Sequence, residues 1–234
     1  SYDDLHRGMR TLKYLEALTF STKTQIVRAE NRQLSKGHRH LIDRNLVEKL
    51  IESLPYPLTE SQRIALREMM DDMDSPLVMY RLLQGDVGTG KTLVAALVAY
   101  ACVTRGEQAA LMAPTDALAK QHFETLKTMF EGTKVSIGLL VGTMDNYEKR
   151  NTLADLADGT LDIVVGTHAL FSKGVNYNSL GLAIIDEQHK FGENQRTTLL
   201  DKGENADLLL MSATPIPRTL ALTVYGDLDV STLT

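Results

Sequence analysis

The sequence predicts an α/β fold, in which a mainly parallel sheet carries helices on both faces and a helical segment precedes it. From residue 78 onward, short apolar runs rich in β-branched residues alternate with longer segments of helical character. Parallel strands need crossover connections and are buried on both sides, so this alternation is typical of a parallel sheet between two helical layers. Before residue 55, in contrast, apolar residues recur at helical spacing.

Two apolar series predict two helices in the first 54 residues. They are Leu5, Met9, Leu12 and Leu15, and, after the break KGH at residues 36–38, Ile42, Leu46, Leu50 and Leu54. Pro55 is expected to end the second helix, because proline lacks the amide hydrogen that a helix interior uses. Six apolar runs predict strands: VMYRLLQ (78–84), QAALMAP (108–114), VSIGLLV (135–141), DIVVGT (162–167), LAIIDE (182–187) and DLLLMSA (207–213).

Composition restricts the class of protein. A chain of 234 residues with 43% hydrophobic content can build a full globular core. Its single cysteine, Cys102, excludes an intrachain disulfide and favours a reducing compartment, and we interpret it as a small core residue. The apolar run LVAALVAYACV at 93–103 is well short of the roughly 20 residues of a membrane span. We therefore expect a soluble, cytoplasmic protein without a membrane partner.

Charge is unevenly distributed along the chain. The net charge is -5, yet residues 1–50 carry ten Lys and Arg against six Asp and Glu. The basic side chains there include Arg28, Arg32, Lys36, Arg39 and Arg44. Such a group can face nucleic-acid phosphates, and it can equally be a solvated helix face.

The segment LLQGDVGTGKT predicts a phosphate-binding loop. It has the pattern GxxxxGK[ST], directly after an apolar strand and directly before a helical run, which is the context this motif requires. Its backbone amides and the positive end of the following helix dipole would face the phosphates. Lys91 would reach the β and γ phosphates, and Thr92 would ligate Mg²⁺. The expected nucleotide-binding residues are Gly85, Asp86, Val87, Gly88, Thr89, Gly90, Lys91 and Thr92.

An acidic pair follows the fifth predicted strand, in LAIIDEQH. Asp186 is the candidate Mg²⁺ ligand and Glu187 the candidate base for the attacking water. An acidic pair after a strand is commonly a helix N-cap, but the phosphate loop upstream favours catalysis. Ligands bind at the carboxyl ends of parallel strands, where both motifs fall.

The order of motifs resembles the first motor domain of superfamily two helicases, most closely the RecG-type branched-DNA helicases of bacteria. The motifs are LTESQ, GDVGTGKT, APTDALAKQH, VVGTHALF, IIDEQHKFG and MSATPIPRT, and they cover roughly the last three quarters of the chain. The resemblance implies a RecA-like P-loop fold and an ATP hydrolase, dependent on Mg²⁺, that remodels forks and Holliday junctions in DNA repair and recombination.

The resemblance also assigns residues. Tyr56, Thr59 and Gln62 match positions that read the adenine; Pro114, Thr115, Thr167 and His168 match loops on the DNA backbone; Gln188, His189, Ser212, Thr214 and Arg218 match positions that couple the nucleotide site to the DNA cleft. Taken singly, each is also an ordinary loop or helix residue. Lys190 departs from the family, which usually has arginine there.

The implied organisation is a linking helical segment at residues 1–54, a motor domain at 55–225 and the start of an interdomain linker at 226–234. A second RecA-like domain and a DNA-wedge domain are then expected elsewhere in a longer protein. Two alternatives stay open. Transcription-repair coupling translocases share TPIPRT but tend to have DEEQ where this chain has DEQH, and the chain could also be a module that only binds nucleotide.

Overall fold

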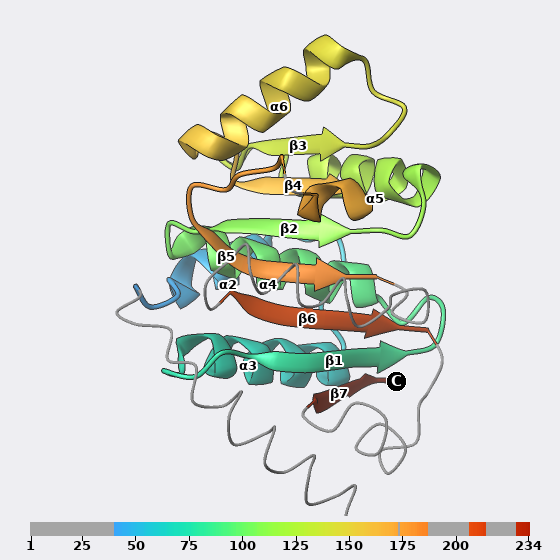
Figure 1. Ribbon diagram of the computed structural model, residues 1–234. Helices are drawn as coiled ribbons and strands as arrows, with labels where there is room; N and C mark the ends of the chain where they lie inside the picture. The colour runs from blue at the N-terminus through green and yellow to red at the C-terminus, as the bar shows by residue number, and fades with distance from the viewer. Residues whose placement is uncertain (1–39, 173, 187–205, 214–227) are drawn as a thin grey trace, which may run out of the picture.

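The computed structural model describes residues 40–172, 174–186, 206–213 and 228–234. Their strands form one sheet of seven, all pairings in it are parallel, and the order is β3-β4-β2-β5-β6-β1-β7 (Figure 1). The strands are β1 (Tyr80–Gly85), β2 (Gln108–Met112), β3 (Ile137–Leu140), β4 (Ile163–Gly166), β5 (Leu180–Ile185), β6 (Asp207–Ser212) and β7 (Asp229–Leu233). The predicted parallel α/β fold is confirmed, and each of the six apolar runs contains a strand.

Strand β7 is the element that the sequence did not indicate. Residues 226–234 are expected from the sequence to begin an interdomain linker, whereas the structure pairs β7 with β1 in the same sheet. Its residues do not form an apolar run, because Ser231 and Thr232 are polar. Ser231 is buried and Thr232 is exposed, and only Leu233 supplies a buried apolar side chain. Pairing with β1 therefore decides the conformation of a segment whose composition does not predict a strand.

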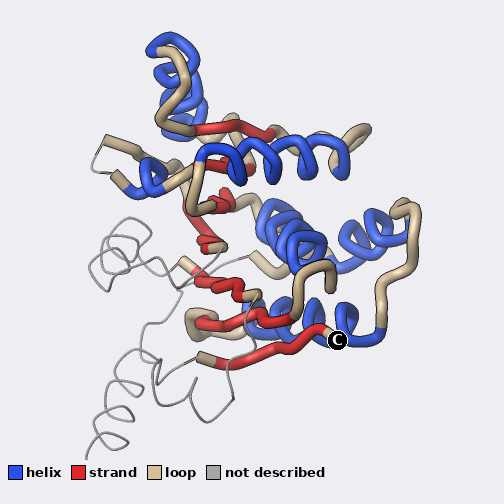
Figure 2. The backbone as a smooth tube through the Cα atoms, turned by 90° about the vertical axis from the view of Figure 1, so that its right-hand side faces the viewer, coloured by secondary structure: helices blue, strands red, loops and turns tan. Residues whose placement is uncertain are grey.

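Helices lie on both faces of the sheet (Figure 2). They are α2 (Arg44–Glu52), α3 (Glu60–Asp74), α4 (Lys91–Thr104), α5 (Asp116–Met129) and α6 (Asn146–Asp158), with the short 3₁₀ helix η1 (His168–Phe171). Helices α2 to α5 pack in one hydrophobic cluster, and α6 and η1 pack in the other. Leu83 and Leu82, neighbours on β1, belong to different clusters, since successive side chains of a strand point to opposite faces.

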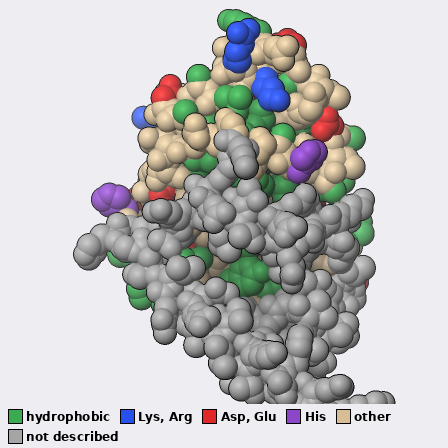
Figure 3. Space-filling view, in the orientation of Figure 1, with side chains coloured by type: hydrophobic (Ala, Val, Ile, Leu, Met, Phe, Trp, Pro, Cys, Tyr) green, Lys and Arg blue, Asp and Glu red, His purple; other side chains and the backbone are tan. Residues whose placement is uncertain are grey.

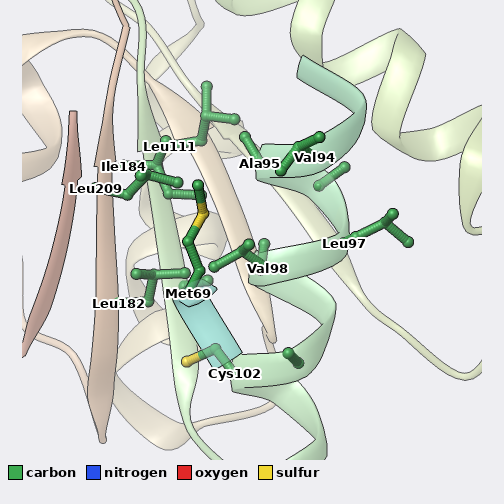
Figure 4. Packing of buried hydrophobic residues seen from close by; sticks show 14 of the residues in the cluster. Met69, Val94, Ala95, Leu97, Val98, Cys102, Leu111, Leu182, Ile184 and Leu209 are labelled. Atoms are coloured by element: carbon green, nitrogen blue, oxygen red, sulfur yellow. The ribbon is translucent and has the colours of Figure 1, made fainter. Parts of the chain in front are cut away.

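The larger cluster fixes helix α4 against the middle of the sheet. Figure 4 shows Val98 of α4 and Met69 of α3 facing Leu111, Ile184 and Leu209 of three adjacent strands. All five side chains are fully buried. Burying one such side chain contributes about 1.5–3 kcal/mol, so the helix that follows the phosphate loop has a firm base.

Helix α2 confirms the second expected helix but turns a different face to the core. Its buried residues are Val47, Leu50 and Ile51, whereas Leu46, expected on the apolar face, is 40% exposed. The helix ends at Glu52, before Pro55. It packs in the same cluster as α3 and α4, so the expected linking segment contributes to the core of the described domain.

Helix α4 contains the apolar run at 93–103, and its side chains are buried almost throughout. Cys102 is fully buried there, as predicted for a core residue, and this burial raises the pKa of its thiol to about 12. No helix within the described ranges has both the length and the apolar character needed to cross a membrane.

Candidate active site

The described candidate residues that follow strands gather at the edge where the parallel strands end. Gln84 of β1 lies opposite Ser212 of β6, and Met112 of β2 lies opposite both Ile185 of β5 and Gly166 of β4. The phosphate loop after β1, the acidic motif after β5 and the two loops expected to contact DNA, after β2 and β4, therefore leave the same edge of the sheet, with β6 between β1 and β5. This arrangement matches the expectation that ligands bind at the carboxyl edge of a parallel sheet.

Glycine is required at positions of the phosphate loop for two different reasons, backbone conformation and space. Gly88 and Gly90 adopt left-handed backbone conformations, with φ of 89° and 83°, that other residues rarely tolerate. Gly85 is needed for space, since a Cβ atom there would lie 2.7 Å from Oγ1 of Thr89 and 3.0 Å from the carbonyl oxygen of Leu233. Strand β7 thus packs directly against the start of the loop.

Lys91 folds back onto the loop that precedes it. Its Nζ donates hydrogen bonds to the carbonyl oxygens of Gly85, at 2.6 Å, and of Asp86, at 2.8 Å. The hydroxyl of Thr89 also donates to the Asp86 carbonyl, at 2.9 Å. The ammonium is therefore held inside the loop by neutral acceptors, and an anionic phosphate oxygen is a stronger acceptor for the same group.

Gln62 joins the start of helix α3 to the phosphate loop. Its Oε1 accepts from the backbone amide of Thr59, at 2.9 Å, and its Nε2 donates to the carbonyl of Thr89, at 2.9 Å. The hydroxyl of Thr59 in turn accepts from the Gln62 amide, which completes a capping box. Tyr56, which lies shortly before Thr59 in the sequence, is 79% exposed, so its ring is open to solvent. Adenine recognition by these three residues stays a prediction.

Asp186 follows β5 and is fixed at both its backbone and its side chain. Its amide donates to the carbonyl of Met112, at 2.9 Å, and its Oδ2 lies 2.8 Å from Nε2 of His122 on α5. The sequence did not single out His122, although the motif APTDALAKQH ends on it. A signal was present, because His122 shares the helical spacing of Ala119 and Leu126, which are both buried.

The donor set suits Mg²⁺ better than a metal held by protein alone. Among the residues that the structure describes, no three His, Cys, Asp or Glu side chains gather into a metal-binding group. Mg²⁺ is usually bound by one or two carboxylates together with substrate phosphates and water. Asp186 directly after β5 and the hydroxyl of Thr92 in the first turn of α4 are oxygen donors of this kind, and their role as Mg²⁺ ligands stays a prediction.

The expected DNA-backbone residues are not equally accessible. Thr115 caps α5, where its hydroxyl accepts from the amide of Leu118, and it is exposed beside half-buried Pro114. His168 is also exposed, but Thr167 is only 4% exposed. Thr167 could therefore offer a DNA strand little of its side chain, and a contact from it would depend on its backbone.

The described basic side chains include exposed ones on α6 and one member of the expected basic group, Arg44. Figure 3 shows basic side chains at the α6 end of the molecule, where Lys149 and Arg150 are exposed. Arg44, one of the expected basic group, is bound by Asp71 at 2.8 Å and Asp74 at 2.7 Å. Its charge is balanced by these carboxylates, so this member of the group fits a solvated helix face better than a phosphate contact.

Several expected site residues lie outside the described residues. They are the candidate base Glu187, the coupling residues Gln188, His189, Thr214 and Arg218, the substituted Lys190, and Arg28, Arg32, Lys36 and Arg39 of the basic group. Ser212 is described and is fully buried at the end of β6. Its predicted role in coupling, like those of the residues just named, stays a prediction.

Comparison with known proteins gives consistent matches. The family model described as DEAD/DEAH box helicase matches residues 59–223. The ATP-dependent DNA helicase RecG of Streptococcus pneumoniae serotype 4 is 48% identical over 96% of this chain and 33% of its own length. That of Bacillus subtilis (strain 168) is 47% identical over 98% of this chain and 34% of its own length. The chain thus spans about a third of the length of these curated relatives.

Solved structures agree with the sequence comparisons. A structure of RecG bound to a three-way DNA junction matches with a TM-score of 0.88 and 40% identity, over 100% of this chain and 31% of that one. A hypothetical ATP-dependent RNA helicase from Sulfolobus tokodaii, at 21% identity and a TM-score of 0.60, shares the fold. From the matched family model, the parallel sheet and the phosphate loop, we conclude that the chain belongs to the DEAD/DEAH box helicase family and is similar to RecG over its whole length.

Proposed function

We propose that the chain is the ATP-binding and ATP-hydrolysing motor domain of a bacterial helicase that remodels branched DNA in repair and recombination. The observation that carries this proposal is the whole-chain likeness to RecG, including the RecG structure bound to a three-way junction. The fold supports it, because the phosphate loop after β1 and the segments expected to contact DNA, after β2 and β4, all leave the carboxyl edge of one parallel sheet. The RecG relatives also favour branched DNA over the activity of a transcription-repair coupling translocase.

The proposed chemistry assigns each residue one task. The loop amides and the ammonium of Lys91 bind the phosphates, and the hydroxyl of Thr92 with the carboxylate of Asp186 holds Mg²⁺. Mg²⁺ when bound neutralises charge on the phosphate oxygens. Glu187 accepts the proton of the attacking water. Gln62 and Thr59 hold the adenine end of the nucleotide.

The proposal extends to partners that this chain does not contain on its own. Motors of this kind act through a second RecA-like domain, and forks are opened by a separate wedge domain. We place both in the same natural protein, since the relatives are about three times as long as the chain. The bacterial cytoplasm, where DNA and ATP occur together, is the proposed compartment.

A test compares branched and linear DNA as activators. The natural protein that contains this chain is assayed for ATP hydrolysis with a three-way junction and with a linear duplex of equal base-pair number. We expect stimulation several-fold greater with the junction, and we expect Lys91→Ala to remove it. Equal stimulation by the two DNAs would contradict the preference for branches, and activity that survives Lys91→Ala would contradict the assigned ATP site.

A further inference from the structure

We propose that His122 is a positioning residue for the metal-binding carboxylate. It holds Oδ2 of Asp186 from helix α5, so that the other carboxylate oxygen faces the position of the ATP-bound Mg²⁺. The inference rests on the proposed function, in which Asp186 binds that Mg²⁺. The observation behind it is the 2.8 Å contact between Nε2 of His122 and Oδ2 of Asp186.

The direction of this hydrogen bond follows from its chemistry. An ionised carboxylate can only accept hydrogen bonds, and a neutral imidazole carries its hydrogen on one nitrogen. Nε2 of His122 must therefore carry the hydrogen and donate it to Asp186. This assigns the tautomer of His122 from the bonding partner alone.

The backbone hydrogen bond of Asp186 does not restrict rotation of its carboxylate about the last side-chain bond. The amide of Asp186 donates to the carbonyl of Met112, which extends the β2–β5 pairing one residue beyond the strand. Rotation about the last side-chain bond of aspartate is nevertheless soft, with a broad, two-fold preference. The hydrogen bond from His122 removes this freedom, because it binds one oxygen and leaves the other to a ligand.

His122 is itself held rigidly enough to orient its partner. It is 7% exposed and lies on the buried face of α5, between Ala119 and Leu126, which are fully buried. Helix α5 begins at its cap residue Thr115, two turns before His122, and Thr115 belongs to the segment expected to contact DNA. The donor of the Asp186 hydrogen bond therefore comes from the same rigid helix as a predicted DNA contact.

A purely structural role for His122 predicts a different result on substitution. A buried histidine that only satisfies its own hydrogen bond would affect stability when replaced, but not the metal. Residues that orient metal ligands typically change metal affinity 10- to 100-fold when replaced. Metal affinity and thermal stability, measured in the same variants, thus separate the two roles.

Two substitutions of His122 place an amide hydrogen-bond donor at different distances from the backbone. In His122→Gln, the amide nitrogen is the same number of bonds from Cβ as Nε2 of histidine, so it can reach Asp186. In His122→Asn, the same amide is one methylene shorter and cannot. Leu126→Val, one turn along the buried face of α5, is the matched control for a loss of packing without a loss of hydrogen bonding.

The measurement is Mn²⁺ binding to the 234-residue chain in the presence of a saturating non-hydrolysable ATP analogue, followed by the electron paramagnetic resonance of free Mn²⁺. Metal-free affinity for the analogue and the melting temperature are recorded beside it. We expect His122→Asn to weaken Mn²⁺ binding about tenfold or more, with metal-free affinity for the analogue unchanged. His122→Gln should stay close to wild type, and Leu126→Val should lower only the melting temperature.

Three outcomes would overturn the positioning role: Mn²⁺ binding unchanged in His122→Asn, equal weakening in His122→Gln and His122→Asn, or the same weakening in Leu126→Val. The comparison of Gln with Asn keeps the test informative, since both carry the same group at the same site. If the wild-type chain did not bind the analogue at all, that result would instead overturn the proposed function, and this inference with it.

Discussion

Lys91 is the residue on which we expect the proposed nucleotide site to depend most. The loop fixes its ammonium through two carbonyl oxygens, those of Gly85 and Asp86, and not through a carboxylate. Neutral acceptors hold a cation less strongly than an anion does, so a phosphate can take the ammonium over without breaking an ion pair. The loop geometry itself comes from Gly85, Gly88 and Gly90 and does not need the lysine side chain.

Lys91→Ala should therefore abolish tight nucleotide binding and leave the fold intact. A hydrogen bond to a charged group contributes about 1.5–3 kcal/mol, so the affinity for ATP should fall roughly 10- to 150-fold. Fluorescence anisotropy of a labelled ATP analogue measures the affinity, and circular dichroism checks the fold. Lys49→Ala, which removes an exposed lysine of α2, is the control and should bind as wild type does. Wild-type affinity in Lys91→Ala would remove this site assignment.

Cys102 should be unreactive as long as the chain is folded. Its thiol is fully buried, and because burial raises its pKa to about 12, the reactive thiolate is scarce at pH 8. Mass spectrometry after treatment with iodoacetamide at pH 8 should find no adduct on native protein and one on protein unfolded in guanidinium chloride. An adduct formed equally fast in both samples would show that the core around α4 opens freely.

The sequence predicted the residues of this site unequally well. Lys91 and Asp186 could be found because each belongs to a motif with fixed spacing after an apolar strand. His122 was not found, since its helical spacing with Ala119 and Leu126 indicates burial but does not name Asp186 as its partner until the helix is placed against β5. Thr167 was assigned to the DNA surface by resemblance, yet its side chain is buried, which spacing along the chain cannot show.

A buried ion network joins the carboxyl ends of α3 and α4 to the amino end of β6. Arg105, just after α4, binds Asp207 of β6 at 3.2 Å and Glu107 at 2.7 Å. Its Nη1 also donates to the carbonyl of Met73 in the last turn of α3, and Asp207 accepts from the amide of Met79. The side chains of Arg105 and Asp207 are fully buried, so each charge depends on the other.

Asp207→Ala should strongly destabilise the fold. The substitution removes one of the two carboxylates that bind the buried Arg105 and also the acceptor of the Met79 amide, while Glu107 remains, so the loss should approach the roughly 3–5 kcal/mol of the free energy of unfolding that breaking a buried pair costs. Urea denaturation measures that free energy. Asp71→Ala is the matched control, because Asp71 pairs with Arg44 on the surface and Asp74 remains to bind the same arginine. It should cost less than about 1 kcal/mol. A similar loss in the two variants would contradict a role for burial.

At the scale of elements, apolar runs predicted six strands because parallel strands are buried on both faces. Two features escaped this signal. Strand β7 is half polar and lies at the sheet edge, where one neighbour, β1, decides its conformation. The apolar face of α2 was expected to include Leu46, but packing against α4 selects Val47 and Ile51. Both depend on partners distant in sequence.

The whole molecule places the residues of the proposed nucleotide site at the carboxyl edge of the sheet. The phosphate loop, Asp186 and the start of α5 follow β1, β5 and β2 at the same edge of the sheet, and the loop itself carries Lys91 as its one basic residue. Within the described residues, the buried arginines Arg81 and Arg105 are both bound by carboxylates. Transfer of a phosphoryl group usually needs a further cation, often an arginine from another domain.

The 234-residue chain should therefore bind Mg²⁺-ATP but hydrolyse it slowly, with little stimulation by branched DNA. Loss of a catalytic arginine in related phosphoryl-transfer sites lowers the rate about 10³- to 10⁵-fold, whereas the groups that bind the nucleotide lie in the loop and at Asp186. Arg218 of the motif TPIPRT, outside the described residues, is the candidate from this chain for supplying that cation.

The measurement is the steady-state rate of ATP hydrolysis by this chain, with and without a model fork, beside the natural protein that contains it. Arg218→Ala in the same chain is the companion variant. A slow rate that the fork does not change, with ATP binding retained, agrees with a cation supplied from outside residues 1–234. A fork-stimulated rate near that of the natural protein would show that this chain holds every group the chemistry needs. Loss of that fork-stimulated rate in Arg218→Ala would then identify Arg218 as the cation.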